Sequence, residues 1–194
     1  MKRLLEYGGY AAAVVLVVFG IGAVVLSLIG KDTVEESLSQ EKIVGSADMT
    51  PEGIAESAEA AGLSGVDLPK CTVAGEEVDT GGEAKCFADY MRIHALAATG
   101  GKTYAEMPQY ATDDGQGTND PAEATKTPDG RPAPNAAREI WVTETALSTA
   151  LYTAFMADQL GNFGIVVGFA LILAGVGFAV LSRMALHNRA ATAT

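Results

Sequence analysis

Two long stretches without a charged residue lie near the two ends of the sequence. The first runs from Gly8 to Gly30 and the second from Gln159 to Ser182. A hydrocarbon core about 30 Å thick needs about 20 helical residues, and a helix satisfies its own backbone hydrogen bonds there. The sequence therefore predicts a mainly α membrane protein, with transmembrane helices at 8–30 and 161–182.

The first stretch has an alternative interpretation as a cleaved signal peptide, because Lys2 and Arg3 precede it as a basic flank would. The stretch is longer than the apolar region of a signal peptide, and no clear small-x-small cleavage site follows it. We therefore expect a retained anchor.

The charges divide the chain into basic ends and an acidic middle. The whole sequence holds 13 Lys and Arg against 24 Asp and Glu, a net charge of -11. Glu6 is the one acid of the two tails, whose basic residues are Lys2, Arg3, Arg183 and Arg189. Residues 31–161 consequently carry 9 basic and 23 acidic side chains, a net charge of -14.

This asymmetry predicts orientation, because Lys and Arg beside a span are retained on the cytoplasmic side. We expect tails 1–7 and 183–194 on the cytoplasmic side of a plasma membrane and residues 31–160 outside it. The acidic balance argues against nucleic acid as a partner, since phosphates need a basic surface. A protein that docks on the exterior segment should instead present Lys or Arg.

Both cysteines, Cys71 and Cys86, fall in the predicted exterior segment, where thiols are usually oxidised. We expect a disulfide between them; two buried free thiols are the alternative. Zinc is disfavoured, because His94 is the one histidine of that segment and makes no recognised ligand spacing with the cysteines.

Helices dominate the expected exterior domain, residues 31–135. Thr50, Pro51 and Glu52 form a typical helix start, which predicts a helix over Pro51–Ala61 that stops at Gly62. A second helix is expected from about Glu83 to Thr99, closed by Gly100 and Gly101. Its apolar side chains occupy more than one face, so this helix should be the buried centre of the domain.

Residues 111–135 are rich in Asp, Gly, Thr and Pro and nearly lack large apolar side chains, which predicts an irregular arm. From Ala136 the pattern becomes helical again, with Ile140, Leu147, Leu151 and Phe155 on one face. We expect residues 136–160 to lead into the second span as one long helix, with a kink at Gly161-Asn162. A separate helix along the membrane surface is the alternative.

Small residues recur every seven positions on both apolar stretches. They are Ala13, Gly20 and Ser27 on the first, and Gly161, Gly168, Gly175 and Ser182 on the second, where Gly164-x-x-x-Gly168 adds a further pair. Small side chains let helix backbones approach closely, and such packing drives association in lipid. The pattern predicts a tight antiparallel hairpin whose other face contacts a second protein or another copy. The general glycine richness of membrane helices is the alternative.

Few residues suggest a catalytic, cofactor-binding or metal-binding site. Neither span carries an ionisable side chain between its ends, which argues against a charged substrate path, and no nucleotide-binding, haem-attachment, zinc-protease or serine-hydrolase motif occurs. Asp113, Asp114, Asp120 and Asp129 resemble loose calcium ligands but lack the EF-hand spacing, which favours a solvated charge run. His94 is a candidate base or ligand, although a lone helix histidine more often serves packing. We therefore predict no catalytic residue, cofactor or metal.

The cysteine loop and following helix (CTVAGEEVDTGGEAKCFADYMRIHALAATGGKTYAEM) and the run WVTETALSTALYTAFMADQLGNFGIVVGFALILAGVGFAVL resemble a group of short bacterial membrane proteins with one span at each end. Many of these proteins carry an automatic label as aromatic ring-opening dioxygenase. Non-haem iron dioxygenases commonly use two histidines and a carboxylate on one metal, whereas the predicted topology separates His94 and His187 across the membrane. The resemblance thus implies a topology and no established activity. In size and layout the chain is also similar to small accessory subunits of bacterial respiratory supercomplexes.

These observations favour a non-enzymatic structural or accessory subunit that lies in membrane lipid and assembles with itself or with other membrane-protein subunits. Two other classes stay open. One is a channel formed by several copies, and the other is an extracytoplasmic enzyme or binding domain centred near His94.

Overall fold

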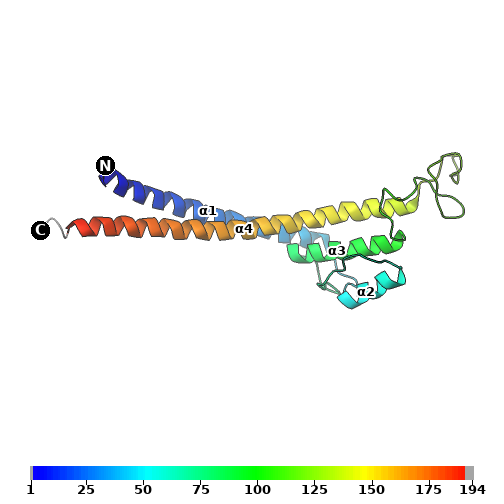
Figure 1. The fold of residues 1–194 in the computed structure, drawn as a ribbon, viewed down its shortest axis with the longest axis horizontal. Coiled ribbons are helices and arrows are strands. Elements are labelled where there is room, and N and C mark those ends of the chain that lie inside the picture. The colour runs from blue at the N-terminus through cyan, green and yellow to red at the C-terminus, as the bar shows by residue number, and fades with distance from the viewer. Residues whose placement is uncertain (1, 191–194) are drawn as a thin grey trace. The chain divides into compact units, whose positions relative to one another are not determined.

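The computed structural model describes residues 2–190, and the side chains of residues 7–184. It contains four helices: α1 (Lys2–Glu41), α2 (Pro51–Ala60), α3 (Gly81–Ala98) and α4 (Ala136–Ala190). Within these residues the only strand-like pairings are isolated bridges. The mainly helical fold is confirmed, with a long apolar helix at each end of the chain (Figure 1).

The chain folds into two compact units. The first, called here the helical hairpin, comprises the residues up to Glu35 and those from Met156 onward. The second, called here the acidic domain, runs from Glu36 to Phe155. Both α1 and α4 include a stretch that is long and apolar enough to cross a membrane, judged by length and composition.

The helix α1 extends well past the predicted span 8–30, because it ends at Glu41. Hydropathy marks only the apolar part of a helix, whereas residues 31–41 include Glu, Ser, Leu and Gln, which tolerate or favour helix in water. The helix stops where Lys42 adopts a left-handed backbone, with φ of 51°.

The short helices begin at capping threonines. Thr50 accepts a hydrogen bond from the Gly53 amide and Pro51 follows it, so α2 begins where the sequence predicts. The helix α3 starts two residues before the predicted Glu83, because Thr80 and Glu83 form a reciprocal capping box. Gly100 and Gly101, with φ of 64° and 76°, follow its last turn.

The core of the acidic domain lies between α2 and α3. Its buried members are Met49, Ile54, Ala58, Val73, Cys86, Tyr90 and Ile93. The predicted disulfide joins Cys71 to Cys86, whose Cα atoms lie 6.1 Å apart. The Tyr90 hydroxyl donates to the Cys71 carbonyl at 2.6 Å, which satisfies the polar end of a fully buried ring. Cys86 on α3 thus ties the loop to the core.

Close backbone approach fixes the chain that enters this core. A Cβ atom at Gly45 would lie 1.8 Å from the Val73 carbonyl oxygen, so only glycine fits here. The Gly45 amide donates to the Glu76 carbonyl at 3.0 Å, and its own carbonyl accepts from the Gly75 amide at 2.8 Å.

The predicted irregular arm, residues 111–135, is held together by local turns and backbone bridges. The Tyr110 amide and carbonyl pair with Thr118 at 2.9 and 3.0 Å. The Ala111 amide donates to the Ala133 carbonyl at 2.9 Å, and the Ala133 amide donates to the Thr125 carbonyl at 2.8 Å. Hydrogen bonds of this kind replace the missing apolar core of the arm.

The helix α4 continues without interruption from Ala136 to Ala190, so residues 136–160 and the second apolar stretch belong to one helix. The expected cytoplasmic tails are helical at residues 2–7 and 183–190. Met1 and residues 191–194 lie outside the described part of the chain, as does the side chain of His187.

Candidate functional site

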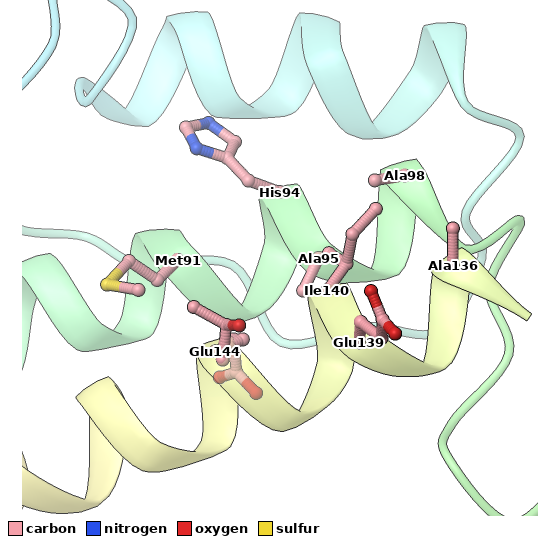
Figure 2. Close-up of a pocket in the computed structure, with 9 residues that line it drawn as sticks. Met91, His94, Ala95, Ala98, Ala136, Glu139, Ile140 and Glu144 are labelled. Carbon is pink, nitrogen blue, oxygen red and sulfur yellow. The ribbon is translucent and has the colours of Figure 1, made fainter. Parts of the chain in front are cut away.

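A groove of about 660 Å³ lies between α3 and the first turns of α4, within the acidic domain (Figure 2). Its lining is mostly apolar and comprises Met91, His94, Ala95, Ala98, Ala136, Glu139, Ile140, Thr143 and Glu144. Ile140 is 44 % exposed beside it. Three alanines leave room between the helices, so the groove can receive an apolar group beside the carboxylate of Glu139.

His94 lines this groove, but its ring is directed away from Glu139 and Glu144 (Figure 2). The Nε2 atom lies 2.9 Å from Asp48 Oδ2, at ion-pair distance, although the ring N–H is not aligned for a hydrogen bond. The Ser46 hydroxyl donates to Asp48 Oδ1 at 2.5 Å and holds the pKa of that carboxyl below its usual value.

The order of contacts in this cluster is Ser46, Asp48, His94. A hydrolytic triad needs the histidine next to the serine, where it can accept the hydroxyl proton. Here the carboxylate stands between the two, so the group that accepts from Ser46 is a weakly basic carboxylate and not the imidazole. The arrangement instead links α3 to the segment that precedes α2.

A second polar group joins α3 to α4. Glu144 is buried, and its carboxylate lies 3.4 Å from Arg92 Nη1 and accepts from the Ser148 hydroxyl at 2.9 Å. The Arg92 guanidinium carbon sits 4.0 Å from the centre of the buried Trp141 ring. The Thr145 hydroxyl also donates to Glu144, at 3.2 Å, so the charge is compensated by one cation and two hydroxyl donors.

Farther along the same pair of helices, the Tyr152 hydroxyl donates to Asp89 Oδ1 at 2.6 Å. Lys85 pairs with the other oxygen of Asp89 at 2.6 Å. Burial, together with the hydrogen bond to a carboxylate, raises the pKa of Tyr152 to about 12. The tyrosine consequently keeps its proton in the folded protein at neutral pH.

The acidic residues of the arm serve its turns. Asp114 and Asp129 accept from the hydroxyls of Thr112 and Thr127, each two residues earlier in the chain. These hydrogen bonds hold the pKa of both carboxyls below the usual value. Asp113 accepts from the Thr125 hydroxyl, and Asp120 from the Ala122 amide. Among the described side chains, no three His, Cys, Asp or Glu gather closely enough to hold a metal ion.

The small residues of the two apolar helices meet one another inside the helical hairpin. A Cβ atom at Gly168 would lie 2.7 Å from the Gly20 carbonyl oxygen, and one at Gly175 would lie 2.9 Å from the Ala13 carbonyl oxygen. A Cβ atom at Gly164 would instead lie 2.1 Å from the Ser27 hydroxyl oxygen, and one at Gly161 would lie 2.6 Å from the Lys31 side chain. Ser182 lies against Gly9, a contact partner outside the seven-residue pattern. At Gly168 and Gly175 the backbones thus approach too closely for larger side chains.

At one end of this small-residue contact, Lys31 of α1 forms an ion pair with Asp158 of α4. Lys31 Nζ also donates to Asn162 Oδ1 at 3.0 Å, and Asn162 Nδ2 donates to Asp158 Oδ2 at 3.2 Å. Sequence reasoning did not find this cluster. The available signal was a single basic residue directly after the first apolar stretch and a single acid directly before the second.

The contacts of Arg92 with Trp141 and Glu144, and of Tyr152 with Asp89, were also missed, because the partners lie 49, 52 and 63 residues apart in the sequence.

Comparison with known proteins found no matching family model, no matching curated protein and no matching solved structure. The structure itself defines the class of the protein: a two-helix apolar hairpin joined to an acidic, disulfide-containing helical domain.

Proposed function

We propose that α1 and α4 cross a bacterial plasma membrane, with both termini in the cytoplasm and residues 31–160 outside. The basic flanks of the apolar stretches support this orientation. The disulfide supports an oxidising location for the acidic domain. The ion pair of Lys31 and Asp158 would then lie at the outer boundary of the membrane, where water is within reach of both groups.

We further propose that the protein is a non-enzymatic accessory subunit of a larger membrane complex. The groove between α3 and α4 carries this proposal, because it combines an apolar floor with an exposed Ile140 and a carboxylate rim on a domain of net negative charge. An apolar, Lys- or Arg-bearing surface of another subunit is the occupant whose charge complements it.

The small-residue contact supports the role of a stable anchor. Because Gly161, Gly164, Gly168 and Gly175 pack within the chain, the opposite faces of both helices stay available to lipid or to another subunit. The loose resemblance to accessory subunits makes a respiratory complex the first assembly in which to look for this protein.

Extraction in a mild detergent followed by native mass measurement tests the accessory role. We expect the 20.0 kDa chain to appear in a larger species with other subunits. That species should dissociate as salt is raised, and more readily in Glu139→Lys than in the control Glu59→Lys, an exposed position on α2 outside the groove. A chain that migrates alone, or only with copies of itself, would contradict the proposal.

A further inference from the structure

A second hollow, of about 310 Å³, lies beside the start of α4 within the acidic domain. It is lined by the loop residues Tyr104 and Gln109, the arm residues Pro134 and Asn135, and the α4 residues Arg138, Glu139, Val142 and Thr143. It differs from the α3–α4 groove in holding a cation, Arg138, inside a domain whose charge is strongly negative.

Arg138 has no carboxylate partner among the described side chains. Its guanidinium carbon lies 3.8 Å from the centre of the Tyr104 ring, which fixes the plane of the group while leaving its edge without an acceptor. The Nε atom is shielded from solvent and has no hydrogen-bond partner. A buried donor of this kind is costly unless an acceptor reaches it.

Two further polar side chains in the hollow make no hydrogen bond to the described part of the chain: the Gln109 amide and the Thr143 hydroxyl. The wall that carries them is fixed by Asn135. Its Nδ2 donates to the Pro108 carbonyl at 3.0 Å, and its Oδ1 accepts from the Ala137 amide at 3.1 Å. The Asn135 amide also donates to the Gln109 carbonyl at 3.0 Å, so the backbone that carries these residues is held in place before any ligand arrives.

We propose that this hollow binds a single carboxylate group, with Arg138 as the main binding residue and Gln109 as a second donor. The planar guanidinium matches the two oxygens of a carboxylate. Glu139 also lines the hollow and is exposed, so a ligand with several negative charges is repelled. A monocarboxylate, either free or carried by a Glu or Asp side chain of another protein, fits these groups.

The test uses the full chain, labelled with nitrogen-15, in detergent micelles. Sodium acetate is titrated against sodium chloride at constant ionic strength while the Arg138 Nε–H resonance is followed by NMR. We expect a saturable shift of that resonance with acetate. In a second arm, a short peptide with one glutamate and blocked termini replaces acetate, so that saturation by acetate indicates a free ligand and saturation by the peptide alone indicates a protein-borne one.

Three variants test whether Arg138 is the residue that binds the carboxylate. Because Arg138→Lys lacks the Nε–H group, binding to all variants is followed by the backbone amide resonance of Asn135, which lines the hollow. Arg138→Lys keeps the charge but loses the planar set of N–H donors, and acetate should bind about tenfold more weakly. Glu139→Gln removes the repulsion, and acetate should bind about two- to fivefold more tightly. Arg131→Gln is the control, because Arg131 is exposed and paired with Asp129, and it should leave binding unchanged.

The far-ultraviolet circular dichroism of each variant establishes that it is folded. Two results would overturn the proposal: an Arg138 resonance that does not saturate with either carboxylate, and acetate binding that is equal in the wild type and in folded Arg138→Lys.

Discussion

Glu144 is the residue whose burial is most costly without a partner. Only 6 % of its side chain is exposed, and its compensating groups are Arg92, Ser148 and Thr145. In Glu144→Gln the side chain keeps its size but loses its charge, so Arg92 loses its ion pair. We expect the free energy of unfolding of the detergent-solubilised protein to fall by about 1.5–3 kcal/mol, measured in urea.

The matched control is Glu139→Gln, one turn earlier on the same helix. Glu139 is exposed and makes no ion pair with the described residues. Its substitution should change the free energy of unfolding by less than about 0.5 kcal/mol. Equal losses in the two variants would show that the contact of Glu144 with Arg92 contributes nothing particular to stability.

Tyr152 makes the free energy of unfolding of the acidic domain depend on pH in the alkaline range. Its pKa in the folded protein is about 12, above the usual value of 10.0. Between these two values the unfolded chain binds fewer protons than the folded one, so the free energy of unfolding decreases as pH rises. Tyr152→Phe cannot lose this proton, and its stability should decrease less steeply between about pH 10 and pH 12.

Denaturant unfolding at a series of pH values measures this slope. Tyr90, whose pKa burial also raises, contributes to the decline in both proteins. The same slope in the wild type and in Tyr152→Phe would contradict the role given to Asp89 and burial at Tyr152.

At the residue scale, the sequence predicts a contact when the two residues are near each other in the chain, and does not predict it when they are far apart. The threonine that caps α2 lies next to the proline that starts the helix, so the pattern predicts the cap. Arg92 and Glu144 are 52 residues apart, and nothing in either local sequence predicts their contact. The Thr80 and Glu83 capping box was local and could have been found from its spacing.

At the level of elements, the contact between α1 and α4 depends on the absence of side chains. In Gly168→Ala the new methyl group would lie 2.7 Å from the Gly20 carbonyl oxygen, and backbone cannot yield as a flexible side chain can. We expect thermal unfolding in detergent at lower temperature, with a loss of about 1–3 kcal/mol.

Gly177→Ala is the control, because a Cβ atom at Gly177 has nothing within 4 Å. Alanine favours helix over glycine by about 1 kcal/mol, so this variant should be unchanged or more stable. A similar loss in both variants would mean that the hairpin does not depend on close approach at Gly168.

The disulfide holds the loop between the two short helices. Its cysteines are 15 residues apart, and a loop of that length is worth about 3 kcal/mol in the chain-entropy model. The double variant Cys71→Ser, Cys86→Ser should lose a comparable free energy of unfolding, as should the wild type in excess reductant. Unfolding curves that coincide with and without reductant would contradict this contribution.

The elements themselves were largely predictable from the sequence. Hydropathy located both apolar stretches, and the glycines after α2 and α3 marked their ends. The extension of α1 to Glu41 was not predicted, because its polar residues carry no hydropathy pattern. The order of the arm was not predicted either, since it arises from threonine and aspartate hydrogen bonds rather than from apolar packing.

At the scale of the whole molecule, we propose that the helical hairpin anchors an acidic exterior domain to the membrane. The anchor is stabilised by small-residue packing and by the ion pair of Lys31 with Asp158. The domain holds the apolar groove, the arginine hollow and most of the negative charge. In the proposed topology, both binding surfaces face away from the cytoplasm.

The proposed topology is tested most directly by measuring which side of the membrane each segment is exposed to. One epitope tag is placed at the C-terminus and another in the arm turn at Gly115, and a membrane-impermeant protease is added to intact spheroplasts. We expect the arm tag to be cleaved at once and the C-terminal tag to be cleaved only after detergent is added. Cleavage of the C-terminal tag in intact spheroplasts, or protection of the arm tag there, would contradict the proposed topology.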